Sequence, residues 1–514
     1  MTKAIQIGWG KRSLAPDFPI PVPGQFYLRV SIGAFTPVLA SAVVIENGED
    51  QVIFVSCDMV SVVPDVLLKV QNLLKSEAPE IDGTKLIINA THTHAGPGSN
   101  DLGDYPSPIK MVHGDEARVF LARQIADAVK EAWNSKAPGS IAYGYGFATT
   151  GHSRRTVYLE DIGSRDGGAP GMAINGHAKM YGTTSDDMFS CYEAGTDAFI
   201  NLLYTFDADE KLTGAVVNVP CPSQTNEHAW ELHASFWAQV RDKLTAKYGE
   251  IGVVGQAAAA GDLSPRQLHY RVAELRRYQL KYADEIAKYM ERPLKFPGER
   301  TAEEQAAVDR QSCLEHMRGE DIANRIVDAF DEVLSWAGKE KFSDPELRHE
   351  VRVVDLARRM FPEAMMEAEK KNYENFMKEE FLTEGDDVQV LRANSTLSSR
   401  RARCKSVVER YAIQQEKPVI PSDIHVVRIG NIAFATNRFE LYMDYMHRIQ
   451  ARSPFEQTFI VQLVTGPHGS GSYLATVRGE ENKGYSASPY CNQVSPEGGQ
   501  QLVEETLKIL KEIK

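Results

Sequence analysis

The 514-residue sequence has no run of about 18 consecutive apolar residues, the length that a membrane-spanning helix needs. It has no excess of basic residues either, because 57 Lys and Arg stand against 70 Asp and Glu and give a net charge of −13. Nucleic acid is therefore not expected as a partner, since binding phosphates needs a basic face. No apolar run of secretory length follows Lys3, so we predict that the protein has no signal peptide and is cytoplasmic.

The six cysteines lie far apart, with no Cys-x-x-Cys pair and no dense framework. In a chain without an export signal this spacing predicts reduced thiols rather than disulfides. The sequence also has no internal repeat and no low-complexity linker. Its length, with 43% hydrophobic residues, allows a large core that needs no metal or disulfide to fold.

The first 260 residues alternate strand-like and helix-like patterns, which is typical of an α/β domain. Apolar or β-branched runs predict strands at 51–58, 85–94, 213–220 and 252–260, and helical spacing predicts helices at 64–76, 116–135 and 234–248. The α/β pattern returns from residue 423 and ends in a helix over 499–513.

Two middle segments differ from this pattern. Residues 266–338 and 362–416 are rich in Glu, Lys, Arg, Ala and Leu and have little strand signal, so we predict helical insertions there. We therefore predict one α/β domain over residues 1–514, with mixed β-sheets flanked by helices and two helical insertions.

The sharpest local motif is ATHTHAGPG at residues 90–98, where a buried strand ends in His92 and His94. Histidines at positions i and i+2 project from one face, and neutral imidazole is the commonest metal ligand in proteins. Ligands bind at strand ends in α/β folds, so this pattern favours a metal site. The alternative is that two polar residues simply close a strand.

A second polar cluster follows the strand at 213–220. Cys221 has His228 and His233 nearby in sequence and could give a thiolate to a metal or act as a nucleophile. The alternative is an inert buried thiol, which most single cysteines are.

Three more strand ends carry polar groups. Asp262 and Ser264 follow the strand at 252–260, Glu440 follows the strand at 425–437, and His468 follows the strand at 458–466. Each segment alone is typical of a solvated loop. Five strand ends of this kind together favour a functional site.

Taken in order, the ATHTHAGPG, GDLSP (261–265) and 440–485 segments resemble the neutral/alkaline non-lysosomal ceramidase family, zinc amidases that cleave an N-acyl bond. The resemblance covers the N-terminal catalytic domain of that family. It implies that this chain lacks the C-terminal β-sandwich domain that follows the catalytic domain in the exported ceramidases.

The resemblance also implies a ligand set for one zinc ion: His92, Cys221, Glu440 and Tyr473. Cys221 departs from the family, which has histidine before the proline at this position. A thiolate is a good zinc ligand, so the site stays chemically reasonable. The arginine of the family's Asn-Arg-Ser motif falls on Arg155, which would bind a negative group of the substrate or the oxyanion.

These residues predict a zinc-dependent hydrolase that cleaves an amide, ester or lactone of a soluble small molecule by metal-activated water. We expect His94, Asp262, Ser264 and Arg155 to take part in catalysis, and Ser264 and Arg155 also to bind the substrate. One alternative is a non-catalytic binding protein that keeps the fold. The other is a metal-free thiol hydrolase that uses Cys221 with His228 or His233. A homo-oligomer is compatible with the sequence.

Overall fold

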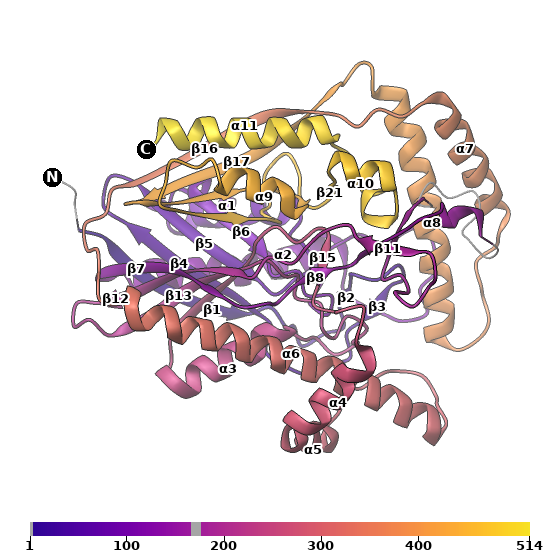
Figure 1. Ribbon diagram of the computed structural model, residues 1–514, viewed down its shortest axis with the longest axis horizontal. Coiled ribbons are helices and arrows are strands. Elements are labelled where there is room, and N and C mark those ends of the chain that lie inside the picture. The colour runs from indigo at the N-terminus through magenta and orange to yellow at the C-terminus, as the bar shows by residue number, and fades with distance from the viewer. Residues whose placement is uncertain (1–3, 166–175) are drawn as a thin grey trace.

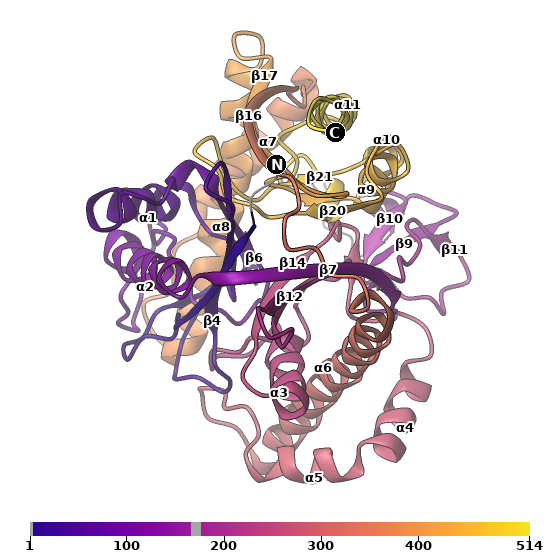
Figure 2. The ribbon, with the colours of Figure 1, turned by 90° about the vertical axis from the view of Figure 1, so that its left-hand side faces the viewer.

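The structure is a computed structural model that describes residues 4–165 and 176–514 (Figure 1). Two β-sheets lie face to face, and helices cover the outer face of each sheet (Figure 2). The described residues thus form four layers in the order helix, sheet, sheet, helix. A hydrophobic core fills each of the three spaces between these layers.

The larger sheet has eight strands in the order β14–β13–β12–β7–β1–β4–β5–β6. Their bounds are β1 Gln6–Ser13, β4 Leu39–Glu46, β5 Gln51–Cys57, β6 Leu86–Ala90, β7 Ala137–Phe147, β12 Phe199–Asp207, β13 Leu212–Val219 and β14 Gly252–Ala257. The sheet is strongly curved, so that its two edge strands, β14 and β6, come together. Gly255 of β14 forms hydrogen bonds with Ser56 of β5 and with Asn89 of β6. This curvature brings segments that follow distant strands to the same region.

Four helices cover the outer face of the larger sheet: α1 Pro64–Glu77, α2 Gly114–Asn134, α3 Phe236–Tyr248 and α6 Ala302–Ala337. α2 packs directly on β1 because Gly8 and Gly10 have no side chain there. A Cβ atom at Gly8 would lie 1.9 Å from the Ala132 carbonyl oxygen, and one at Gly10 would lie 2.2 Å from that of Ala128.

The smaller sheet has four strands in the order β16–β17–β18–β20. Their bounds are β16 Leu347–Ala357, β17 Val419–Ile429, β18 Ile432–Thr436 and β20 Gln457–Val461. Two helices, α9 Met443–Gln450 and α11 Pro496–Glu512, pack on its outer face (Figure 2).

The two sheets are joined by backbone hydrogen bonds at β6, beside the packed side chains between them. The amide of Ala90 donates to the Leu463 carbonyl (3.3 Å), and the amide of Thr465 donates to the Ile88 carbonyl (3.0 Å). The end of β6 therefore lies against the segment that follows β20.

The two segments predicted as insertions contain long helices. Residues 266–338 contain α4 Arg271–Lys281, α5 Ala283–Glu291 and α6, and residues 362–416 contain α7 Glu363–Lys378 and α8 Asp387–Ile413. The second half of α6 packs on the larger sheet through Ile322, Ile326 and Phe330, so it is part of the helical layer. α7 and α8 pair side by side at one end of the molecule (Figure 1).

The predicted fold class is confirmed: mixed β-sheets are flanked by helices, and the predicted strands and helices of the first 260 residues agree with the structure to within a few residues. Within the described ranges, no helix combines the length and the apolar character needed to cross a bilayer. The division into one domain with two insertions and the missing β-sandwich stay predictions.

Candidate active site

The loop after β6 holds His92 in a fixed orientation. His92 has a φ of 66°, and its Nδ1–H donates to the Val60 carbonyl (2.7 Å). Because a neutral imidazole carries one proton, this bond leaves the lone pair of Nε2 free. The hydroxyl of the preceding Thr91 donates to Asp58 (3.2 Å), which also receives two hydrogen bonds from Arg241 (2.6 and 3.0 Å). A buried ion pair thus supports the turn.

The carboxylate of Glu440 lies beside this free nitrogen, with 3.3 Å between Glu440 Oε2 and His92 Nε2. Glu440 begins β19 (Glu440–Leu441), which pairs in parallel with β21 (Tyr473–Leu474), so Glu440 and Tyr473 are direct neighbours. Burial acts to raise the pKa of Glu440, but His92, Arg154 and Tyr473 outweigh it and the pKa is lowered. The structure therefore brings His92, Glu440 and Tyr473 together, with Glu440 ionised.

Arg154 completes this cluster. Its Nη2 donates to the Tyr473 hydroxyl (2.8 Å) and to the Gly261 carbonyl (2.8 Å), and it lies 3.9 Å from Glu440 Oε2. Its Nε–H is buried and has no hydrogen-bond partner among the described residues. The cluster thus contains a guanidinium with one free N–H donor.

Arg155, the arginine indicated by the family motif, lies outside the cluster. Its guanidinium donates to both oxygens of Glu193 (2.7 and 2.9 Å) and also to Ser486 and to the carbonyls of Gly479 and Lys483. Successive side chains of an extended chain point to opposite faces, so only one of two adjacent arginines can face the site. That one is Arg154, so the structure places Arg154 in the cluster and Arg155 beside Glu193.

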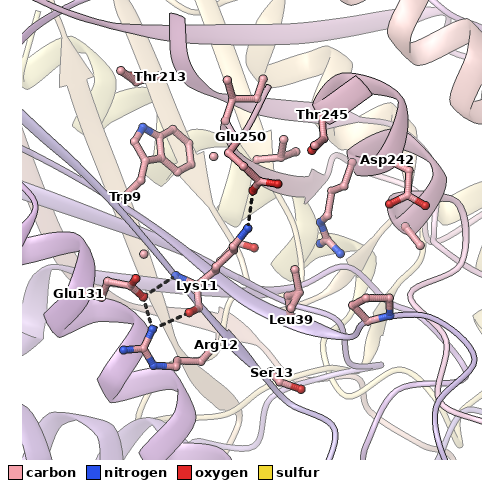
Figure 3. Close-up of a pocket in the computed structure, with 18 of the residues that line it drawn as sticks. Trp9, Lys11, Arg12, Ser13, Leu39, Glu131, Thr213, Asp242, Thr245 and Glu250 are labelled. Carbon is pink, nitrogen blue, oxygen red and sulfur yellow. Dashed lines mark hydrogen bonds and ion pairs between the residues drawn. The ribbon is translucent and has the colours of Figure 1, made fainter. Parts of the chain in front are cut away.

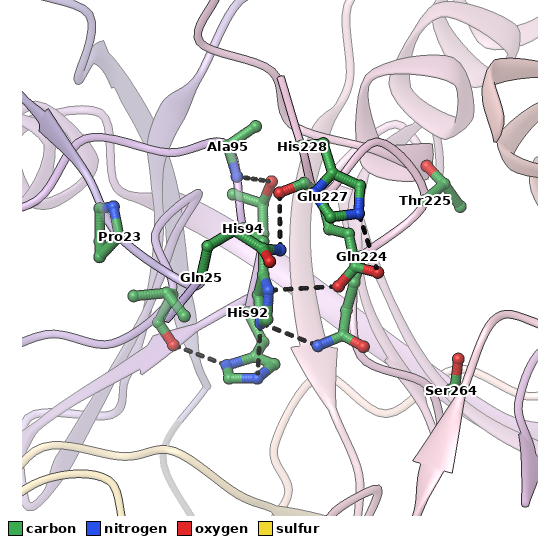
Figure 4. A network of polar contacts seen from close by, with 12 residues as sticks. Pro23, Gln25, His92, His94, Ala95, Gln224, Thr225, Glu227, His228 and Ser264 are labelled. Atoms are coloured by element: carbon green, nitrogen blue, oxygen red, sulfur yellow. Dashed lines mark hydrogen bonds and ion pairs between the residues drawn. The ribbon is translucent and has the colours of Figure 1, made fainter. Parts of the chain in front are cut away.

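His94 lies next to His92, with 3.4 Å between their Nε2 atoms (Figure 4). The amide Nε2 of Gln224 donates to His94 Nε2 (2.8 Å), while Gln224 Oε1 accepts from the Tyr181 hydroxyl (3.3 Å). The proton of His94 is therefore on Nδ1, which faces Glu227 Oε2 at 3.6 Å. Burial holds the pKa of His94 well below its ordinary value, so the ring is neutral.

Gln224 and Glu227 are functional candidates that the motif search missed. Both belong to the cluster after β13, in which the sequence analysis singled out Cys221, His228 and His233. Glu227 also pairs with Arg266 (2.7 Å), which in turn pairs with Glu315 of α6 (3.0 Å). The polar side chains of Gln224 and Glu227 could have been noticed from the sequence, but their contacts with His94 depend on the fold.

Asp262 and Ser264 are buried at the end of β14. Asp262 accepts a hydrogen bond from the amide of Met443, the first residue of α9 (3.1 Å), and burial raises its pKa to about 6. The Ser264 oxygen accepts from the Arg266 amide (3.1 Å). Figure 4 shows Ser264 on the far side of Gln224 from His92. Asp262 therefore bonds to the start of a helix, away from His92, rather than to the histidines.

Cys221 is not brought into the cluster. It is 1% exposed, and its thiol donates to the carbonyls of Thr150 (3.2 Å) and Pro222 (3.5 Å). Burial raises the pKa of the thiol, so it stays protonated. The thiol therefore has backbone carbonyls as its partners and lies outside the cluster of His92, Glu440 and Tyr473, and its role as a ligand or a nucleophile stays a prediction.

The histidines suggested as partners of Cys221 lie elsewhere. His233 is buried, accepts from the Ser235 amide (2.7 Å) and stacks on Phe35. His228 is half exposed and lies 4.0 Å from Glu227 (Figure 4). His468, from another strand end, is exposed and bonds to Asp423 (2.9 Å).

The donor set can be compared with the needs of zinc. Tetrahedral zinc with bonds of about 2.0–2.1 Å has ligand atoms about 3.3 Å apart, which is the His92–Glu440 separation. A carbonyl that fixes Nδ1, as Val60 does for His92, is also typical of metal-binding histidines. No three His, Cys, Asp or Glu side chains converge on one point in the described ranges. The residues present fit a divalent ion only if the Tyr473 oxygen is the third protein ligand.

A separate cavity of about 820 Å³ lies between α2 and α3 on the outer face of the larger sheet (Figure 3). Its charged side chains are mostly neutralised in pairs. Lys11 pairs with Glu250 (2.9 Å), and Arg12 pairs with Glu131. We call this cavity the α2–α3 groove.

The comparisons with known proteins agree with this picture. No family model matches the chain. A curated relative, the neutral ceramidase of Pseudomonas aeruginosa, is 26% identical over 239 residues, which are 44% of this chain and 31% of the relative. The sequence match therefore spans about a third of the length of that relative.

Two solved structures share the fold. The sequence of Pseudomonas aeruginosa neutral ceramidase in its crystal structure is 15% identical to this chain, and the two structures match with a TM-score of 0.62. The match covers 99% of this chain and 75% of the ceramidase chain. A ceramidase complexed with C2 is 14% identical with the same TM-score and the same two coverages. The predicted resemblance to the neutral ceramidases is confirmed, and the chain has their fold.

Proposed function

We propose that this chain is an amide hydrolase that cleaves an N-acyl bond of a small molecule with the help of one zinc ion. The supporting observation is that His92, Glu440 and Tyr473, which come from three distant segments, meet in one buried cluster. The cluster lies in a chain with the fold of neutral ceramidase, an enzyme whose name states that it acts on ceramide.

His92, Glu440 and Tyr473 would hold the ion, which supplies polarisation of the substrate carbonyl and a more acidic bound water. Glu440 is suited to this task because it stays ionised although it is buried. His92 is suited because its Nδ1–H is fixed by a carbonyl and its Nε2 lone pair is free. Cys221 has no part in this proposal.

Arg154 would stabilise the negative charge that develops on the carbonyl oxygen. Its buried Nε–H has no partner among the described residues, so donating to an oxyanion costs no existing hydrogen bond. Its contact with Tyr473 holds the guanidinium beside the cluster. Ser264 is buried, and its hydroxyl oxygen accepts from the amide of Arg266. We propose that this hydroxyl also contacts the substrate.

His94 would accept the proton that the attacking water releases. It is neutral and therefore available as a base, and Glu227, 3.6 Å from Nδ1, would stabilise the imidazolium that forms. The proton would arrive at Nε2 in place of the N–H that Gln224 donates there, and until then Gln224 holds the ring in orientation.

The test combines metal content with turnover of a panel of N-acyl compounds that includes N-acyl sphingosines and short polar amides. The wild type should contain about one zinc per chain and cleave members of the panel. His92→Ala and Glu440→Gln should lose both the zinc and the activity, whereas Cys221→Ser should keep both.

Each alternative predicts a different result. A binding protein would hold its ligand without turnover of any amide. A thiol hydrolase would be active without metal and would lose activity in Cys221→Ser. Unchanged zinc in Glu440→Gln would remove that residue from the proposed site.

A further inference from the structure

The loop between β2 (Pro21–Val22) and β3 (Arg29–Val30) covers the histidine side of the site. Gly24 has a φ of 107°, and a Cβ atom there would lie 2.6 Å from Cγ of His94. Next to it, Gln25 Nε2 donates to the Glu227 carbonyl (3.0 Å). This loop therefore lies directly against the proposed proton acceptor.

A run of aromatic rings leads from this loop to the metal-binding side. Phe26, which is 43% exposed, packs edge-on against Tyr485 with ring centroids 5.0 Å apart. Tyr485 packs in the same way against Tyr473 at 6.0 Å. Phe26, Tyr485 and Tyr473 thus form a wall between the surface and Glu440, and we call them the aromatic wall.

Arg403 of α8 lies on the outer end of the aromatic wall. The carbon of its guanidinium is 4.7 Å from the centroid of Phe26 and 5.8 Å from that of Tyr485. The side chain is half-buried, yet within residues 4–165 and 176–514 it has no hydrogen bond and no ion pair. By contrast, Arg401 and Arg410 of the same helix donate to backbone carbonyls.

An unpaired, half-buried guanidinium is unusual because removing a charge from water costs free energy unless a partner compensates. The stacking on Phe26 and Tyr485 supports the flat face of the guanidinium and leaves the N–H groups at its edge available. A planar fork of free donors is the arrangement that binds a carboxylate with two hydrogen bonds.

The helix that carries Arg403 is basic in an acidic protein. α8 contains six Lys and Arg residues and two Asp and Glu residues, whereas the whole chain has a net charge of −13. The positive potential of this helix attracts an anion to the end of the aromatic wall.

We propose that Arg403 is a specificity residue that binds a carboxylate on the substrate. This inference rests on the proposed amide hydrolysis and deepens it. The substrate is then an N-acyl compound with a carboxylate several bonds from the cleaved amide, because two ring contacts separate Arg403 from Tyr473. Ceramide has no carboxylate, so the proposed substrate class differs from the lipid that gives the similar enzyme its name.

The experiment compares pairs of amides that differ only in the carboxylate. On the acyl side the pair is N-succinyl and N-butyryl p-nitroanilide, and on the amine side it is N-acetyl-6-aminohexanoate and N-acetyl-6-aminohexanol. The wild type should prefer the carboxylate in at least one pair by about tenfold to a hundredfold in kcat/KM, the range expected for a charge-assisted hydrogen bond.

Arg403→Gln should abolish this preference and leave kcat/KM for the neutral member unchanged, whereas Arg403→Lys should restore part of it. Arg400→Gln is the matched control, because Arg400 lies on the same helix, is exposed and stacks on Phe376 instead. It should keep the preference. An equal loss for both members in Arg403→Gln would indicate a structural role and overturn the proposal.

A second measurement separates this inference from the proposed function. Ketomethylene isosteres of the two carboxylate compounds cannot be cleaved, and the binding of each is followed by calorimetry. Weaker binding by about tenfold in Arg403→Gln supports the carboxylate site even if no amide is hydrolysed. Equal binding to wild type and Arg403→Gln overturns it, even if the protein is an active amidase.

Discussion

Two histidine pairs in the described part of the chain, His349 with His425 and His92 with His94, differ in how their protons are arranged. In the core between the sheets, His349 Nδ1–H donates to the Gln51 carbonyl (3.1 Å), so its Nε2 accepts from Nδ1 of His425 (2.9 Å). Every contact in this pair joins a donor to an acceptor. The pair is satisfied without any ion.

The pair at the candidate site has the opposite arrangement. The Nε2 atoms of His92 and His94 lie 3.4 Å apart, His94 Nε2 already accepts from Gln224, and the Glu440 carboxylate lies 3.3 Å from His92 Nε2. Because the Val60 carbonyl takes the Nδ1–H of His92, the contact of His92 Nε2 with Glu440 needs either a second proton on the imidazole or a cation. The comparison shows that a site is recognised by an unmet electrostatic need rather than by the presence of two histidines.

The largest effect is expected from removing one histidine of each pair. His92→Ala should lower kcat/KM at least about a thousandfold, equivalent to about 4 kcal/mol, and should lose bound zinc. His425→Leu should keep zinc and kcat/KM, and it should lower the free energy of unfolding by about 1–3 kcal/mol because His349 loses its donor. Metal analysis, kinetics and denaturant unfolding of both variants provide the test. A loss of zinc in His425→Leu would remove the distinction between the pairs.

The adjacent arginines give the next largest effects, and of different kinds. Arg154→Met should lower kcat by about a hundredfold to a thousandfold, because it removes the proposed oxyanion donor. Arg155→Met should instead lower the free energy of unfolding by about 3–5 kcal/mol, because it leaves Glu193 buried without its partner. Turnover per folded molecule, measured beside urea unfolding, separates the two. An inactive but fully stable Arg155→Met would contradict the assignment.

Acid should weaken the core pair. Burial lowers the pKa of His349 and of His425 to about 3, well below the value of about 6.5 in the unfolded chain. As the pH falls from about 6.5 towards 3, the unfolded state binds more protons, so stability decreases by roughly 1 kcal/mol per pH unit for each histidine. Above about pH 6.5 this contribution is fully present. A His349→Gln, His425→Leu double variant should show a shallower acid dependence in unfolding experiments.

A smaller effect is expected at Cys221. Cys221→Ala should lower stability by about 1 kcal/mol through the small cavity it leaves, and it should retain zinc and activity. Peptide mapping should find the thiol unreactive towards alkylating reagents before and after chelation, while the exposed Cys191 reacts in both cases. New reactivity of Cys221 after chelation would restore it as a ligand.

The smallest effect is expected in the α2–α3 groove. The Lys11–Glu250 pair is exposed, so Lys11→Met should change stability by less than about 0.5 kcal/mol. The kcat/KM of this variant should stay within about twofold of wild type. A tenfold loss of activity would show that the groove, and not only the histidine cluster, serves the reaction.

The sequence predicted the fold class and the segments of the site, because both depend on local patterns. Strand and helix periodicity located β5, β6, β13 and β14, and the polar residues after β6 and β18 marked His92 and Glu440. The family motif indicated Arg155, whereas Arg154 lies beside Glu440 and Tyr473. The two arginines are adjacent, and the sequence does not show which one faces inward.

Other features of the site arise only from contacts between distant segments. The pairing of β19 with β21 places Glu440 beside Tyr473, and each strand has only two residues, too few for a periodic signal. Cys221 was matched to a ligand by its position before a proline, but the thiol turns to the Thr150 carbonyl. Arg403 was hidden in a helical insertion that gave no sign of facing the site.

The joining of the two sheets at β6 has a consequence for how the protein folds. His92 follows the edge of the larger sheet, whereas Glu440 and Tyr473 lie in the two-stranded sheet of β19 and β21, beyond the strands of the smaller sheet, so neither side alone contains the complete cluster. The cluster assembles only at the final docking of the sheets, which requires contacts between residues more than 300 positions apart in the chain. Catalytic competence should therefore be among the last properties gained during refolding and among the first lost when the sheets begin to separate.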